Sequence, residues 1–327
     1  MLLTTPLHSY HVKHSHLTKF AGYEMPLWYT TTSDEHMAVR NRSGIFDVSH
    51  MGRVWVKGPQ AASFIESLVP TNVTTQAVGK SFYTLLLNQN GGIIDDLIIT
   101  RLSEDRFLLV VNAANATKDL EHIRAQAQGN DVSMEDVTSS SAMIAVQGPR
   151  AAEALQPLTD IDLGTVKRFR SAETMVAGER SLVSRTGYTG EDGFEVIVLG
   201  PTVEKPEGAL KVWEGLAKSA TPCGLGARDS LRLEAGFPLH GSDIDEGTDP
   251  YQADLAWVVS PGKSGYVGSE AVSESSGKRP SFVRRGLVLD EGIPRHGFEL
   301  DADGGKAGTV TSGTFSPLLR KGVAQCH

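Results

Sequence analysis

The chain has 327 residues, of which 40% are hydrophobic, so it is long enough to bury a large core and to form two or three domains. Its formal net charge of −8 excludes a general nucleic-acid-binding protein, which needs a basic face to neutralise phosphates. Because no apolar run could cross a bilayer and the two cysteines, Cys223 and Cys326, form no disulfide framework, we predict a cytoplasmic protein with no membrane partner.

The first half of the chain predicts an alternation of strands and helices. A capping-type Ser33 and a terminating Gly44 predict a short helix between them. Two apolar runs on either side of residues 88–92, which read NQNGG, predict a β-hairpin. Periodicity predicts further strands at 44–48, 53–57 and 107–111 and further helices at 58–70 and 116–126.

The second half begins with similar elements and then changes character. We predict a strand at 143–146, a hairpin at 187–200 and helices at 150–155, 209–219 and 227–235. The polar stretch 273–280 is typical of a linker, and the short glycine-rich strands beyond it predict a small β-domain.

The segment 187–200, GYTGEDGFEVIVLG, is the most informative part of the chain. Gly190 and Gly193 tolerate the backbone of a tight turn, and the flanking runs alternate as strands do. The hairpin would hold Tyr188, an aromatic that can stack on a flat ligand, and Glu195, a carboxylate that can accept paired hydrogen bonds. Taken alone, the pattern favours an exposed tyrosine and a solvated glutamate.

Two adjacent carboxylates, Asp95 and Asp96, interrupt an otherwise apolar strand just after the turn at 88–92. Side chains alternate along a strand, so the two should face opposite sides of the sheet. One can be solvated, whereas the other enters the interior, where a carboxylate is usually salt-bridged or functional. The pattern leaves these two possibilities open.

Other candidate motifs are weaker. His8, His11, His14 and His16 have spacings that could bind zinc, but no cysteine or acidic ligand accompanies them, so we predict no metal site and a solvated or partly packed segment. Arg228 opens ARDSLRLEAG, which alone indicates a surface helix with ordinary charge pairs. Neither a phosphate-binding glycine loop nor a nucleophile elbow is present.

Taken together, motifs along nearly the whole chain resemble the aminomethyltransferase family, the T-protein of the glycine cleavage system. The resemblance implies an α+β, three-lobed fold with antiparallel sheets and a C-terminal β-barrel domain. It divides the chain into a folate-binding region at 1–262, made of two interleaved lobes, and the barrel domain at 280–327, predicted to be incomplete. The motifs, in order, are TPLHSYHVKH, FAGYEMPLWY, GIFDVSHMGR, NQNGGIIDDLIITR, VVNAANATKDL, AVQGP, RTGYTGEDGFE, GLGARDSLRLEAGFPLHGSDIDE and GTVTSGTFSP.

The resemblance also implies a reaction and its partners. A methylene group would pass from the aminomethylated lipoyl arm of H-protein to tetrahydrofolate as co-substrate, with release of ammonia and without a metal. Asp96 would be the catalytic carboxylate, and Asp95 its outward-facing neighbour with a structural role. The residues implied to bind the folate are Glu195, Arg228, Tyr188, Asn112 and Met51.

Two other functions remain possible at this stage. A related tetrahydrofolate-dependent demethylase would act on a small methylated substrate instead of a lipoylated protein. A non-catalytic folate-binding scaffold would keep the fold but carry different pocket residues. The presence of both Asp96 and Glu195 favours an enzyme.

Overall fold

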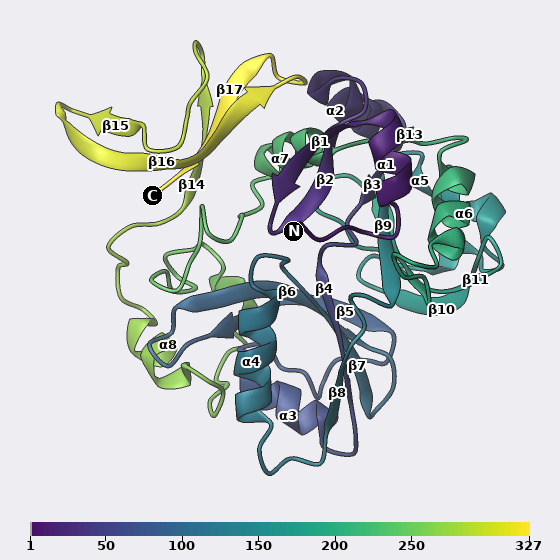
Figure 1. Cartoon of the computed structure of the whole chain (residues 1–327). Coiled ribbons are helices and arrows are strands. Elements are labelled where there is room, and N and C mark those ends of the chain that lie inside the picture. The colour runs from purple at the N-terminus through teal and green to yellow at the C-terminus, as the bar shows by residue number, and fades with distance from the viewer. Residues whose placement is uncertain (1) are drawn as a thin grey trace.

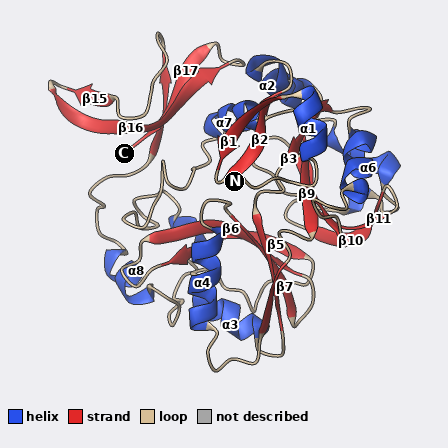
Figure 2. Cartoon of the chain, in the orientation of Figure 1, coloured by secondary structure: helices blue, strands red, loops and turns tan. Residues whose placement is uncertain are grey.

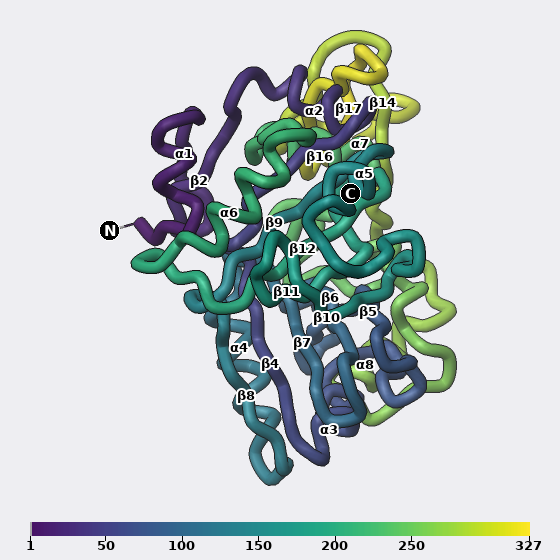
Figure 3. The backbone as a smooth tube through the Cα atoms, turned by 90° about the vertical axis from the view of Figure 1, so that its right-hand side faces the viewer, coloured from purple at the N-terminus to yellow at the C-terminus, as the bar shows by residue number. Residues whose placement is uncertain are grey.

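The computed structural model describes residues 2–327, and within them the strands form four sheets. Figure 1 shows three groups of elements: a five-stranded sheet with two helices, a six-stranded sheet with two helices, and a C-terminal sheet at the other end of the molecule. The view turned by 90° places the five-stranded sheet and the C-terminal sheet at opposite ends as well (Figure 3). The candidate site residues come from a few strands and loops of the first two groups and from one helix, at Leu225–Glu234, that contacts the third.

The six-stranded sheet is built from two separate stretches of chain. Its order is β10-β11-β12-β9-β3-β13, antiparallel except where β13 pairs with β3. Helices α5 (Ala151–Leu155) and α6 (Glu207–Leu216) pack against it through an apolar cluster that includes Trp213 and Phe194. The strands are β3 (Gly44–Asp47), β9 (Ser141–Gln147), β10 (Ser171–Val176), β11 (Glu179–Ser184), β12 (Gly193–Leu199) and β13 (Thr221–Pro222).

The five-stranded sheet uses the alternation of its side chains to build two cores. Val54 and Val56 enter the cluster under helices α3 (Ala61–Leu68) and α4 (Ala116–Gln126), whereas Trp55 faces the six-stranded sheet. That second cluster joins both sheets to helix α7 (Leu225–Glu234). The strands, in sheet order, are β5 (Lys80–Leu87), β6 (Ile93–Arg101), β7 (Arg106–Val111), β4 (Gly52–Lys57) and β8 (Ser133–Asp136).

The remaining elements lie at the two ends of the chain. At the N-terminus, α1 (His8–His14), the hairpin β1 (His16–Phe20) and β2 (Tyr23–Trp28), and α2 (Thr32–Asn41) precede the first large sheet. At the C-terminus, a four-stranded antiparallel sheet has the order β14-β17-β16-β15 (Figure 2). The elements of that region are α8 (Ser269–Ser275), β14 (Arg285–Leu289), β15 (Glu299–Ala302), β16 (Gly305–Ser316) and β17 (Lys321–Cys326).

Most of the predicted elements lie where the sequence predicts them, and the differences concern two segments and one histidine. Residues 273–275 of the predicted linker form the last turn of α8. The predicted hairpin at 187–200 has its second strand in β12, but its first strand, β11, ends at Ser184, and 185–192 form a loop. His11, predicted to be solvated or partly packed with the other N-terminal histidines, is fully buried and bonds to Asp47 and to the Tyr29 hydroxyl at 2.8 Å each.

Candidate active site

Asp96 lies in β6, beside a β-bulge that follows the turn of the β5–β6 hairpin. Its Oδ1 accepts a hydrogen bond from Asn112 Nδ2 at 2.8 Å, and its Oδ2 accepts one from the Tyr83 hydroxyl at 3.0 Å. The same Asn112 amide donates to the Asp96 carbonyl at 3.0 Å. The carboxylate is therefore fixed in orientation by the strands on either side of it, β5 and the end of β7.

The surroundings of Asp96 make it a weaker acid. Burial and the neighbouring Asp95 carboxylate raise the pKa of Asp96 to about 7, against the hydrogen bonds from Tyr83 and Asn112, which lower it. A carboxylate whose pKa lies near neutral pH can accept and release protons during turnover. Perturbation of this kind, from burial plus a like charge, is typical of functional groups.

Tyr188 and Arg228 form a stacked pair next to this carboxylate. The Arg228 guanidinium carbon lies 4.7 Å from the centre of the Tyr188 ring, and Phe237 stacks on the same ring at 5.8 Å. The Tyr188 hydroxyl donates to the Pro238 carbonyl. Burial is the main cause that raises the pKa of Tyr188, and the Asp96 charge adds to it, so the aromatic group and the acid share one environment.

Arg228 has a positive charge that its neighbours do not neutralise. Among residues 2–327, its guanidinium nitrogens make no hydrogen bond or ion pair within usual distances. Burial lowers the pKa of Arg228, and Tyr188 and Glu195 act in the opposite direction. A partly buried guanidinium without an acceptor is suited to an anionic or hydrogen-bond-accepting ligand.

Glu195 lies in β12 of the six-stranded sheet and is partly buried. One of its carboxylate oxygens, Oε2, accepts a hydrogen bond from the Thr186 hydroxyl. Burial raises the pKa of Glu195, while Thr186 and the Arg228 charge lower it. The second oxygen is not used by a protein donor within the described chain, so it can accept a bond from a ligand.

The structure thus brings five of the six predicted site residues into one electrostatic neighbourhood. Met51 is the exception: it is partly exposed and packs on the apolar cluster between the two large sheets. The expectation that Asp95 faces outward is wrong, because its side chain is completely buried. Asp95 accepts from the Asn112 backbone and side-chain nitrogens at 2.9 Å each, so the bulge turns both carboxylates toward one amide.

Sequence reasoning missed Tyr83, which holds Asp96 directly. In the β5–β6 register Leu85 pairs with Asp96, and Tyr83 lies two residues from Leu85 on the same face of the sheet. The hairpin predicted around residues 88–92 fixes this register, so the proximity of Tyr83 to Asp96 could have been inferred from it. Trp257 was also missed; its ring stacks on Tyr83 at 5.6 Å, although its own side chain is 68% exposed.

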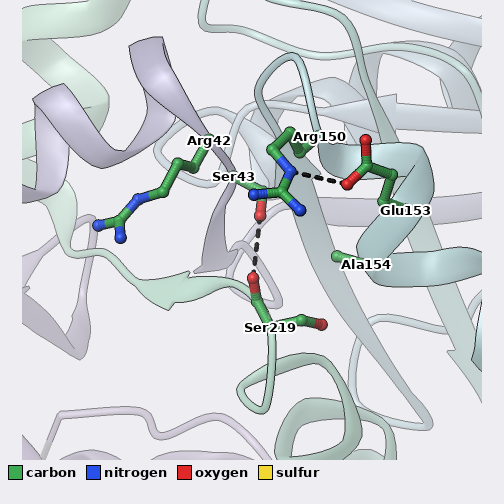
Figure 4. A pocket seen from close by; sticks show the side chains of 6 residues that line it. All are labelled: Arg42, Ser43, Arg150, Glu153, Ala154 and Ser219. Carbon is green, nitrogen blue, oxygen red and sulfur yellow. Dashed lines mark hydrogen bonds and ion pairs between the residues drawn. The ribbon is translucent and has the colours of Figure 1, made fainter.

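A surface cavity of about 400 Å³ lies elsewhere, between the end of α2 and α5, and contains no predicted site residue. In Figure 4 the Arg150 side chain turns to Glu153, whose carboxylate it contacts at 2.7 Å, whereas Arg42 points away from both. The two arginines therefore do not converge on one ligand. Within residues 2–327, no group of three His, Cys, Asp or Glu side chains is arranged to hold a metal ion.

Comparison with known proteins identifies the family of this arrangement. The profile of the GCVT N-terminal domain matches residues 7–263. The chain belongs to the GCVT family. An aminomethyltransferase of Thermus thermophilus is 45% identical over 325 residues, which cover 99% of this chain and 90% of the relative. One of Geobacillus kaustophilus is 42% identical over 332 residues, which cover 99% of this chain and 89% of the relative.

A solved structure gives the same result for the fold. The glycine cleavage system aminomethyltransferase T from Bartonella henselae superposes with a TM-score of 0.92 at 36% identity, over 100% of this chain and 90% of that protein. The predicted α+β aminomethyltransferase fold is therefore confirmed. The helices of residues 2–327 are all too short or too polar to count as candidate membrane spans.

Proposed function

We propose that this member of the GCVT family is the aminomethyltransferase of the glycine cleavage system and transfers a methylene group to tetrahydrofolate with release of ammonia. The observation that carries the proposal is the Asp96 carboxylate, fixed by Tyr83 and Asn112 and with its pKa raised to about 7. Tyr188, whose pKa the Asp96 charge helps to raise, links it to Arg228, which stacks on the Tyr188 ring and acts in turn on Glu195. The cytoplasmic location and the boundaries at 262 and 280 stay predictions from the sequence.

The residues present fit a reduced pterin. Glu195 has one oxygen with no protein donor, and an aminopyrimidine edge offers paired N–H donors that a carboxylate accepts well. Arg228 would bind the polar part of the ligand while it stays stacked on Tyr188. Asn112 would line the pocket on the side of the five-stranded sheet. Met51, which lies outside the charged group on the apolar cluster between the two large sheets, would contact the ligand from that cluster. When bound, tetrahydrofolate supplies the nitrogen that takes up the methylene group.

Asp96 would contribute in two ways. As a fixed anion in a water-poor site, it stabilises the positive charge that develops during the transfer more than it stabilises the bound substrates. As a base with a pKa near neutrality, it can take the proton that the attacking nitrogen loses. Tyr83 and Asn112 keep its two oxygens oriented for both tasks.

The donor partner would be the lipoylated H-protein, as the Bartonella relative's place in the glycine cleavage system suggests. A demethylase would accept a free methylated compound instead. Assays with aminomethylated H-protein and with free methylated amines or thioethers distinguish the two. Turnover with the free compounds alone would contradict the proposal.

The folate site can be tested by calorimetric titration with a stable reduced folate. We expect saturable one-to-one binding by the wild type and its loss in Glu195→Ala. Glu179→Ala is the matched control, because Glu179 lies in the neighbouring strand β11 and pairs only with Lys211 at the surface. Equal loss in both variants, or unchanged binding in Glu195→Ala, would exclude the proposed pocket.

A further inference from the structure

Asp119, in the first turn of α4, is a buried carboxyl group that no N–H or O–H of the described chain reaches. Its residue is 0% exposed, and neither Oδ1 nor Oδ2 has a hydrogen-bond donor. A buried anion in this position would be uncompensated, and proteins avoid that cost by neutralising the group. Asn115 links it to Asp95: the Asp119 backbone nitrogen donates to the Asn115 carbonyl at 2.8 Å, and the Asn115 side chain donates to Asp95 Oδ1 at 2.5 Å. The two carboxyl groups are thereby within reach of each other.

The hydrogen bonds around Asp95 show which of the two acids keeps its charge. Asp95 Oδ2 accepts from the Asn112 backbone nitrogen at 2.9 Å, and Oδ1 accepts from the side chains of Asn112, at 2.9 Å, and Asn115, at 2.5 Å. Three amide donors stabilise a carboxylate. Asp119 receives none, so one proton shared by the pair belongs on Asp119, which then donates it to Asp95.

We infer that Asp119 is a positioning residue for the proposed reaction: as a neutral acid it donates a hydrogen bond to Asp95, and Asp95 holds Asn112 against Asp96. The connection is continuous, since the Asn112 side-chain nitrogen donates both to Asp95 Oδ1 at 2.9 Å and to Asp96 Oδ1 at 2.8 Å. Asn112 can serve both acids only while Asp95 stays in place. Among the described residues, no other side chain or backbone group offers the Asp119 carboxyl group a hydrogen bond.

The charges that face Asp119 favour its neutral form. Burial first, and then the carboxylates of Asp95 and Asp96, raise the pKa of Asp119 to about 10, while Lys118 on the same helix acts in the opposite direction. His122, one turn along α4, is itself kept neutral because burial lowers its pKa. At neutral pH the acid therefore keeps its proton, and the hydrogen bond to Asp95 persists.

The first test compares the removal of the hydrogen-bond donor with its replacement. We expect Asp119→Ala to lower kcat at least tenfold, because Asp95 and Asn112 lose their support. Asp119→Asn keeps a donor of similar shape and should stay within about threefold of the wild type. Ile123→Ala is the control: it removes a fully buried apolar side chain from the same helix, so it weakens α4 without touching the acid pair.

Two outcomes would overturn the inference. One is a loss of kcat in Ile123→Ala as large as in Asp119→Ala at equal folded fraction, which would mean that only the stability of α4 matters. The other is an Asp119→Asn variant as impaired as Asp119→Ala, which would mean that donation to Asp95 is not the function of the side chain. Either result leaves the proposed reaction itself intact, because folate titration and donor assays test it separately.

A second measurement tests the protonation state and does not depend on the proposed function. Unfolded aspartate has a pKa of about 3.9, so a folded protein with neutral Asp119 binds one proton more than the unfolded chain between about pH 5 and pH 9. The unfolding equilibrium constant should therefore increase about tenfold more per pH unit in the wild type than in Asp119→Asn. Urea titrations of both proteins at several pH values measure this, and equal pH slopes would show that Asp119 is ionised.

Discussion

The two large sheets contribute to the candidate site in different ways. On the five-stranded sheet, both oxygens of Asp96 are held by protein donors, and Asn112, one of these donors, is also bound to Asp95. On the six-stranded sheet and α7, residues 2–327 offer Glu195 one donor, and they offer the Arg228 guanidinium an aromatic ring but no acceptor. The first half is complete without a ligand, as expected for a group that must be preorganised for chemistry. The second half has hydrogen-bonding capacity left over, as expected for a surface that recognises a ligand.

The largest effect should come from Asp96→Asn, which removes the charge but keeps the shape. We expect kcat to fall at least 100-fold, while the dissociation constant of a reduced folate changes by less than about fivefold, since the recognition groups lie on the other sheet. Single-turnover kinetics and calorimetry measure the two quantities. Equal changes in kcat and in the folate dissociation constant would contradict the assignment of chemistry to one sheet and ligand recognition to the other.

Arg228→Met should affect mainly recognition. Loss of the guanidinium removes the stacking on Tyr188 and the charge near Glu195, an effect on the order of 1–2 kcal/mol, or about 5- to 30-fold in the folate dissociation constant. We expect kcat at saturating folate to stay within about threefold. Arg180→Met, at a β11 position that pairs with Met175 of β10 next to the turn between these two strands, is the control.

The pH dependence of turnover sharpens the comparison further. If Asp96 acts as a carboxylate, kcat should rise with pH through about 7 and fall as the pH drops below it. Asp95→Asn removes the nearest negative charge, so the midpoint should move to lower pH, by about one unit. Tyr83, Tyr188 and Asp119 also face Asp96 and remain in this variant.

A midpoint that stays the same in Asp95→Asn would mean that another group controls the acid limb. The maximal kcat of Asp95→Asn does not test this prediction, because the substitution also changes the hydrogen bonds to Asn112. Only the position of the midpoint reports on the charge.

The smallest effect should come from Tyr188→Phe. The substitution keeps the ring under Arg228 and removes the hydroxyl that donates to the Pro238 carbonyl. One neutral hydrogen bond contributes on the order of 1 kcal/mol, so we expect a lower melting temperature by a few degrees and folate binding within about threefold of the wild type. Thermal unfolding and calorimetry check both, and a large loss of affinity would assign the hydroxyl to the ligand.

The sequence was sufficient for most elements. It also singled out five residues that lie in one charged neighbourhood, and their roles in binding and catalysis stay predictions. Helix α4 begins and ends where the periodicity predicts, and the turn at 88–92 sets the register that brings Tyr83 to Asp96. The loop 185–192 could not be predicted, because it depends on a distant strand. A Cβ on Gly187 would lie 1.9 Å from the Gln147 side chain, and Thr189 donates to Gln147 at 2.9 Å, so this segment packs on β9 instead of extending β11.

The burial of Asp95 was unpredictable for a similar reason. Strand alternation places neighbouring side chains on opposite faces, but the bulge between Leu86 and Leu87 changes the local geometry. The partners Asn115 and Asp119 come from the start of another element, α4. Local patterns locate such residues in the chain but do not show that they meet.

The two large sheets differ in how soon they can form during synthesis on the ribosome. All strands of the five-stranded sheet lie within 52–136, so this unit can form as soon as that stretch has emerged. Strand β3 is synthesised earlier, but its partner strands come much later in the chain. Gly44 pairs with Gln147 of β9 and with Thr221 of β13. Its apolar residues must therefore wait through the translation of about a hundred codons before β9 is made, which exposes them to aggregation and makes them a natural target for chaperones.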